Sequence, residues 1–165
     1  MAAGSTYTPI ATTTLGSAAA SYTFSSIPST YTDLMLVSSV KSNGTGDDLR
    51  IVLNTSGNAN YSFTQLYGNG STASSNRGSN ETAGLIGGVN ASGGNLETVI
   101  TQFQGYSNGT TFTTWLSRSN QAGSYVNAIV GLWRYVDVIN SIQIKCPSNN
   151  LAAGSTFTLY GIAAA

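Results

Sequence analysis

Alternation of apolar and polar side chains with a period of two is the feature that most constrains how this sequence folds. Along residues 49–54, for example, Leu, Ile and Leu alternate with Arg, Val and Asn. Successive residues of a β-strand point to opposite faces, so this pattern predicts strands with one buried face. No segment shows the apolar stripe of a helix of four or more turns. Strands are predicted over residues 10–15, 21–24, 33–41, 49–54, 95–106, 110–117, 125–134, 138–146 and 155–162.

Clusters of Gly, Asn and Ser separate the predicted strands, as turns do. Many short strands with regular turns are typical of β-sandwiches and β-barrels. A length of 165 residues suits one domain, residues 1–165. We therefore expect an all-β fold, an antiparallel β-sandwich of jelly-roll type. Two stretches are expected to depart from it: a flexible N-terminal arm at residues 1–9 and a loop-rich Gly/Asn/Ser insertion at residues 56–94.

Charged side chains are scarce: they make up 7% of the residues, against about 25% in an ordinary soluble domain. Six basic residues balance six acidic ones without any basic cluster, so nucleic acid is not an expected partner. The longest apolar run, residues 128–133, is far too short to cross a bilayer, and no membrane contact is expected. The first residues show no secretory signal and Cys146 is the only cysteine, which favours assembly in a reducing cytoplasm.

Conventional catalytic chemistry is missing from the sequence. Without a histidine, the chain cannot build a Ser-His-Asp or Cys-His nucleophile system or an imidazole metal site. The phosphate-binding loop motif is also absent. Cys146 precedes Pro147 at a predicted strand end and is interpreted as a small buried hydrophobe. We expect a protein that is not an enzyme, with no catalytic residues and no cofactor.

The six carboxylates leave two alternatives open. Adjacent Asp47 and Asp48 would suit calcium if they lay in a loop, although solvated turn residues are the favoured interpretation and no metal is expected. On a strand the two would point to opposite faces and would not pair. A glycosidase needs only two facing carboxylates, so a depolymerising enzyme stays a third class of function. The acids available for such a pair are Asp33, Asp47, Asp48, Glu81, Glu97 and Asp137.

Aromatic side chains divide into two groups by their place in the pattern. Those within apolar alternation are predicted to be core residues: Phe24, Phe103, Phe112, Trp133 and Phe157. Four others lie near predicted turns: Tyr61, Tyr67, Tyr106 and Tyr125. A flat ring with a polar tip suits both stacking on sugars and protein interfaces. We expect these four tyrosines to form a contact surface, for either use.

Three segments are similar to parts of a known module. Residues 19–37 (AASYTFSSIPSTYTDLMLV) resemble its opening, and residues 152–162 (AAGSTFTLYGI) resemble its closing strand. Residues 140–144 (NSIQI) fit its penultimate strand, whereas residues 56–94 have no counterpart. The pattern resembles a β-sandwich module of tailed-bacteriophage virion structural proteins, which occurs in head decoration proteins, head fibres and tail-fibre tips.

The resemblance implies a virion component that is assembled in the host cytoplasm. Such modules are typically β-sandwiches and often trimers, so the implied partners are further copies of this chain and the major capsid protein. Only a short stretch precedes residue 19, without a fibre shaft, which favours a capsid decoration protein of the cement or head-fibre kind. The alternative is the receptor- or glycan-binding tip of a tail fibre, with host surface glycans as partners.

Overall fold

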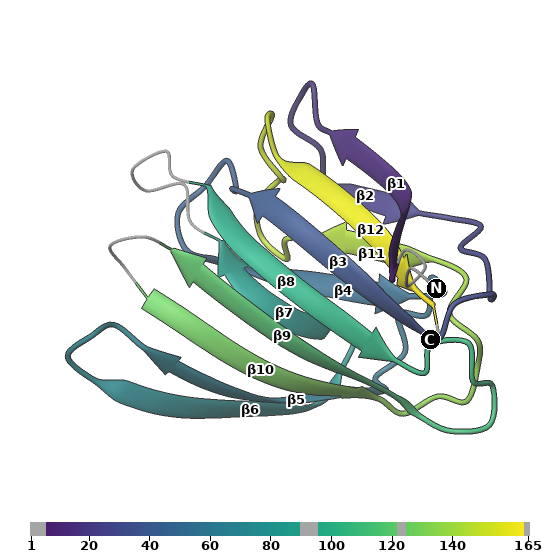
Figure 1. Cartoon of the computed structure of the whole chain (residues 1–165). Helices are drawn as coiled ribbons and strands as arrows, with labels where there is room; N and C mark the ends of the chain where they lie inside the picture. Colours follow the sequence, from purple (N-terminus) through teal and green to yellow (C-terminus); the bar gives the residue numbers. More distant parts are fainter. Residues whose placement is uncertain (1–5, 90–95, 122–124, 164–165) are drawn as a thin grey trace.

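The computed structural model describes residues 6–89, 96–121 and 125–163, and every regular element among them is a β-strand. The strands form two antiparallel sheets that face one another, so the predicted antiparallel β-sandwich is confirmed (Figure 1). The larger sheet has the order β1-β12-β3-β8-β9-β10-β5-β6, and the smaller sheet has the order β2-β11-β4-β7. The strand bounds are β1 (Tyr7–Thr14), β2 (Ser21–Phe24), β3 (Asp33–Val40), β4 (Asp47–Leu53), β5 (Tyr61–Gly68), β6 (Ala73–Glu81), β7 (Gly84–Val89), β8 (Glu97–Gln104), β9 (Thr113–Gln121), β10 (Tyr125–Trp133), β11 (Ile142–Lys145) and β12 (Thr156–Ile162).

Alternation in the sequence becomes alternation in burial. Along β3, Leu34, Leu36 and Val40 are fully buried, while Met35 and Val37 are half-buried on the opposite face. The same period of two runs through β8, β10, β11 and β12. Each sheet therefore contributes one apolar face to a shared core and turns its other face outward.

Successive strands pass back and forth between the sheets at both ends of the chain. Strands β1 and β3 belong to the larger sheet and β2 and β4 to the smaller one, and β7–β8 and β11–β12 each cross between them. The larger sheet continues past β7, the edge strand of the smaller sheet. As a result, the β5–β6 hairpin overhangs that edge (Figure 1).

Three large aromatic side chains meet in the core. The Tyr61 ring lies 6.3 Å from Trp133 and 6.3 Å from Trp115, centroid to centroid. The Tyr61 hydroxyl accepts a hydrogen bond from the Leu53 amide at 2.8 Å, which ties β5 to the end of β4. A Cβ atom at Gly131 would lie 1.9 Å from the Trp115 indole, so glycine is required there for the ring to fit.

The expectation of a loop-rich insertion at residues 56–94 is wrong, because three strands cross that stretch. Strand β6 shows no apolar alternation because it is an edge strand that is exposed on both faces. Strand β7 is glycine-rich because it is crowded: Cβ atoms at Gly84 and Gly87 would lie 2.7 Å from Trp115 and 3.0 Å from Val99. Residues 90–94 lie outside the described part of the chain.

Other boundaries also shift. Tyr7 to Pro9 belong to β1 and pair with β12, so this part of the expected N-terminal arm is a strand, while residues 1–5 lie outside the described part. Strand β9 begins at Thr113, and Phe112, which was predicted to be core, is 50% exposed. Phe24, Phe103, Trp133 and Phe157 are buried, as predicted.

Candidate functional site

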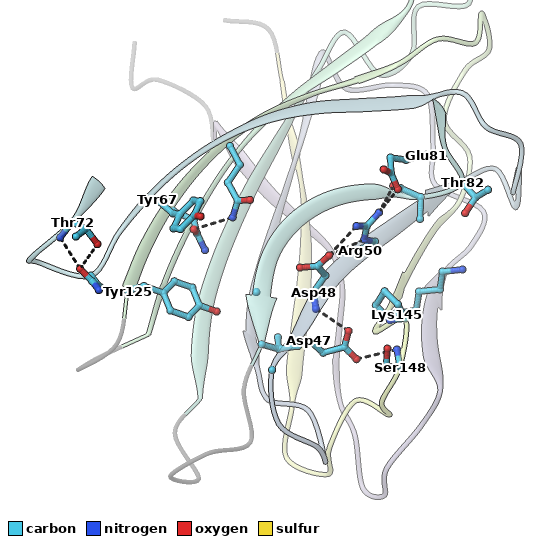
Figure 2. A pocket seen from close by; sticks show the side chains of 18 residues that line it. Asp47, Asp48, Arg50, Tyr67, Thr72, Glu81, Thr82, Tyr125, Lys145 and Ser148 are labelled. Carbon is cyan, nitrogen blue, oxygen red and sulfur yellow. Dashed lines mark hydrogen bonds and ion pairs between the residues drawn. The ribbon is translucent and has the colours of Figure 1, made fainter. Parts of the chain in front are cut away.

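A groove of about 1250 Å³ opens where the β5–β6 hairpin overhangs the edge of the smaller sheet (Figure 2). One wall comes from the inner face of β5 and β10, and the other from β4, β7 and the segment around residues 145–148. Phe63, Leu85 and Ile129 form a small buried cluster that packs β7 against β5 and β10. This cluster holds the two walls together at the closed side of the groove.

Arg50 organises the charged wall. Its Nε and Nη2 atoms donate to Asp48 Oδ2 at 3.2 and 2.8 Å, and its Nη1 donates to Glu81 Oε2 at 2.9 Å. The guanidinium carbon also lies 5.8 Å from the centre of the Phe63 ring. Burial by itself lowers the pKa of Arg50, but the hydrogen bonds and charges of Asp48 and Glu81 outweigh it and raise that pKa. The guanidinium is therefore a fixed cation between two carboxylates.

Asp47 ties a neighbouring loop to the start of β4. Its Oδ2 accepts hydrogen bonds from the Ser148 amide at 3.0 Å and from the Asn149 amide and side chain at 2.8 and 3.0 Å. Its Oδ1 accepts the Asp48 amide at 2.8 Å. Asp47 and Asp48 thus lie on a strand rather than in a solvated turn, and they have different partners. Within the described ranges, no three His, Cys, Asp or Glu side chains gather in a way that would hold a metal ion.

The opposite wall carries two tyrosines and an amide pair. Tyr67 is 41% exposed and Tyr125 is half-buried. Gln65 Nε2 donates to Asn127 Oδ1 at 3.1 Å, and Asn127 Nδ2 donates to Ser119 Oγ at 3.1 Å. These bonds fix the orientation of both amides.

Tyr125 is held in place from two sides. Its hydroxyl donates to the buried carboxylate of Glu97 at 3.3 Å, and burial followed by the Glu97 charge raises the pKa of Tyr125. A Cβ atom at Gly88 would lie 2.3 Å from the Tyr125 hydroxyl. The glycine on β7 therefore leaves the space that the phenol occupies.

The predicted tyrosine contact surface is wrong for two of its four members. Tyr61 and Tyr106 are fully buried, and their hydroxyl groups bind backbone groups. The Tyr61 hydroxyl accepts from the Leu53 amide. The Tyr106 hydroxyl accepts from the Tyr31 amide and donates to the Pro28 carbonyl. Both tyrosines lie near turns, but their rings point inward and their hydroxyl groups bind backbone groups of neighbouring segments. Tyr67 and Tyr125 both lie in the groove, where a contact role stays a prediction.

The remaining acids are dispersed. Asp33 accepts from the Gln102 side chain at 3.1 Å and the Gly105 amide at 2.9 Å, and Asp137 accepts from the Asn54 side chain at 3.0 Å. The structure instead brings together Asp48 and Glu81, on either side of Arg50. Arg50 was not predicted from the sequence. The signal was a charged residue within the apolar stretch 49–53, since a partly buried arginine needs partners.

Cys146 is buried, and its interpretation as a small core residue is confirmed. Burial, with smaller contributions from Asp47, Asp48 and Glu97, raises the pKa of its thiol to about 12. The part of the chain that the structure describes contains no helix able to span a membrane.

A second surface lies on the outer face of the larger sheet. Strands β5, β9 and β10 carry one charged residue between them, Arg118. Four aliphatic side chains on these strands are 52–60% exposed: Leu66, Leu116, Val126 and Val130. Val130 pairs directly with Leu116, and Leu66 pairs with Ala128, which lies between Val126 and Val130 on the outer face of β10. We call Leu66, Leu116, Val126 and Val130 the aliphatic patch.

Neither a protein-family model nor a curated protein matches the chain. Among solved structures, it is similar to the exo-inulinase from Aspergillus awamori, with a TM-score of 0.48 and 12% sequence identity. The match covers 94% of this chain but 29% of that one, so this chain spans less than a third of the enzyme's length. A likeness of this size does not extend to function, and no activity follows from it.

Proposed function

We propose that the protein is a non-enzymatic structural subunit of a tailed-phage virion, a capsid decoration protein that docks on the major capsid lattice through its aliphatic patch. The observation that carries this proposal is the continuity of the patch over three adjacent strands, with Arg118 as their one charge. Exposed aliphatic side chains scattered singly are ordinary, whereas a contiguous group on one face favours a protein interface.

The composition of this face suits attachment to a repeated lattice. Hydrophobic contacts and hydrogen bonds between neutral groups are little affected by salt, because ionic screening acts on charges. Beyond the patch, the same outer face carries hydroxyl groups, such as Thr12 and Thr14, which pair with Thr158 and Thr156 across β1 and β12. Binding of this face to the lattice is therefore expected to vary little over a wide range of ionic strength.

The resemblance of residues 19–37, 140–144 and 152–162 to virion modules supports the assignment to a phage particle. These segments supply β2, β12 and most of β3 and β11, which lie within the two sheets. Jelly-roll connectivity is part of the proposal, and the passage of successive strands between the two sheets supports it. A trimer of this chain is the proposed oligomer, since symmetric assembly reuses one patch in every copy.

The test uses particles that lack this protein. The purified chain should bind them equally at 0.05 and 0.5 M NaCl, and Val130→Asp should weaken binding by about tenfold or more, because a carboxylate would be desolvated at the interface. Thr14→Asp adds the same charge to a distant strand of the same face and should bind normally. Unchanged binding by Val130→Asp would contradict the docking face, and a copy number in single digits per virion would contradict a lattice-wide role.

The alternative, a receptor- or glycan-binding tip of a tail fibre, is favoured by a different observation. That role needs a ligand site, and the groove beside Arg50 offers one. Its test is competition: the isolated protein would block adsorption of the phage to its host, and a chain that never does so does not serve as a receptor-binding tip.

A further inference from the structure

The groove beside Arg50 is too polar and too large for an apolar small molecule. Sites for such molecules are mostly apolar and occupy about 300–1000 Å³. This groove measures about 1250 Å³, and charged, amide and hydroxyl side chains dominate its walls. A ligand that fills it must therefore offer many hydrogen-bonding groups along an extended shape.

The walls combine a ring surface with fixed acceptors. Tyr67 and Tyr125 lie on the same wall and on adjacent strands, and Asp48 and Arg50 face them from the other side (Figure 2). Sugar rings present C–H groups on their faces and hydroxyls around their rims. They can therefore stack on a tyrosine ring while they donate to carboxylates and amides.

The polar groups are held before any ligand arrives. Arg50 fixes Asp48 and Glu81, and Gln65 and Asn127 fix one another. Each carboxylate has about four acceptor positions, and the Arg50 bonds occupy only some of them. Preorganised groups lose little conformational entropy on binding. This matters for a saccharide, whose individual contacts with a protein are weak.

The charge of the groove selects among saccharides. Its lining contains three carboxylates, Asp47, Asp48 and Glu81, against two cations, Arg50 and Lys145. Arg50 is already neutralised by its two partners, so an acidic sugar would meet one cation, Lys145, and a surplus of negative charge. Repulsion between like charges disfavours uronate and phosphate ligands, whereas neutral hydroxyls suffer no such cost.

From this geometry we infer that the groove is a binding site for a neutral oligosaccharide several hexose units long. The tyrosine wall stacks the sugar rings, and the Arg50 cluster hydrogen-bonds the hydroxyls. This inference goes beyond the proposed docking function and does not depend on it, because Tyr67 and the aliphatic patch lie on opposite faces of the larger sheet.

The test exposes the purified full chain to an array of neutral hexose hexasaccharides (glucans, galactans and mannans) and of hexuronate hexasaccharides. At least one neutral hexamer should be retained, and the corresponding monosaccharide should bind about tenfold more weakly or worse, since it reaches fewer groups. Tyr67→Ala should weaken binding of the retained hexamer about tenfold, and Asp48→Asn should weaken it as well, because the Arg50 cluster loses its alignment.

Leu66→Ala is the matched control, because it removes the neighbouring exposed side chain on the other face of β5 and should bind the hexamer normally. Retention of no neutral hexamer at millimolar concentration, retention of uronates alone, or equal binding by native protein and Tyr67→Ala would each overturn the inference. Capsid docking by Val130→Asp is measured separately, so failure of one proposal is distinguishable from failure of the other.

Discussion

Strands β5 and β10 pair along their whole length, yet their two ends lie in different surroundings. At one end Tyr61 pairs with Trp133, and both are fully buried beneath the smaller sheet. At the other end Tyr67 pairs with Asn127, and the tyrosine is 41% exposed in the groove. The antiparallel pairing of β5 with β10 runs from one end to the other without a register shift, so what distinguishes the ends is the cover that the smaller sheet provides.

The change of residue type along β5 follows that cover. Its inner face runs from Tyr61 and Phe63 to Gln65 and Tyr67, from a closed core to an open wall. A strand that is buried along its whole inner face would keep apolar residues throughout. The comparison therefore teaches that one strand can serve the core and the candidate site, with the edge of β7 as the boundary between them.

The largest expected effect comes from the core end. Gly131→Ala would place a Cβ atom 1.9 Å from the Trp115 indole and would disturb the bond from Trp115 Nε1 to the Leu85 carbonyl. We expect a loss of about 3 kcal/mol or more in the free energy of unfolding, measured by urea denaturation. Gly16→Ala is the control, because nothing lies within 4 Å of its added Cβ. A stability like that of the native protein would contradict tight packing at this end.

Alkaline pH should weaken the same end. Burial raises the pKa of Tyr61 to about 12 from a reference of 10.0. The unfolded phenol ionises from pH 10 upward while the folded one stays neutral, so the stabilisation is complete below pH 10 and is lost as pH rises through 12. A difference of this size corresponds to about 2–3 kcal/mol.

Tyr61→Phe provides the comparison, measured by denaturation at pH 9 to 12. The variant should be less stable than the native protein at pH 9, because the Leu53 amide loses its acceptor, but its stability should fall less steeply above pH 10. Cys146, whose pKa is also raised to about 12, contributes a similar alkaline decline to both proteins. Equal slopes in the two proteins would show that Tyr61 does not ionise differently on folding.

At the groove end, Arg50→Gln should cost about 1 kcal/mol of stability. Two carboxylates that are 46% and 35% exposed would remain near one another without their cation, but water would screen them. Arg77 is exposed, lies on β6 and has no ion pair among the described residues, so Arg77→Gln should change stability by less than about 0.5 kcal/mol. A loss of several kcal/mol for Arg50→Gln would mean that the groove end is as tightly built as the core end.

The smallest expected effect is that of Tyr67→Ala on stability, less than about 0.5 kcal/mol by thermal denaturation. Tyr67 is 41% exposed, so its loss removes much less buried surface than the loss of a fully buried aromatic residue such as Trp133. Trp133→Ala, at the buried end of the paired strand, should cost about 3–5 kcal/mol. Equal losses in the free energy of unfolding for the two substitutions would contradict a boundary at β7 between a tightly packed end and an open end.

Much of the sandwich was predictable from local pattern. Strands β3, β10 and β12 lie within about one residue of their predicted bounds, because each has one buried and one outward face and the period of two survives. Strands β6 and β7 were missed for opposite reasons. Strand β6 is exposed on both faces, and β7 needs glycine to pass beneath Trp115 and Val99. In neither case does burial impose an apolar alternation.

The candidate site was only half predictable. Tyr67 and Tyr125 stood out as turn-proximal tyrosines, but nothing in the sequence separated them from Tyr61 and Tyr106, which are buried. That separation depends on which strand ends the smaller sheet covers. The meeting of Arg50 with Glu81, 31 positions away, likewise depends on the pairing of β4 with β7, the strand that follows Glu81 in the chain.

The amino-acid sequence by itself determined the strand periodicity, the low charge and the absence of histidine chemistry, since these depend on residue types and on neighbours in the chain. Only the tertiary structure decided which strands lie at sheet edges, how far the larger sheet overhangs the smaller one, and therefore where the groove opens. The physical reason is that exposure belongs to the packing of two sheets, and that packing is set by contacts between residues far apart in sequence.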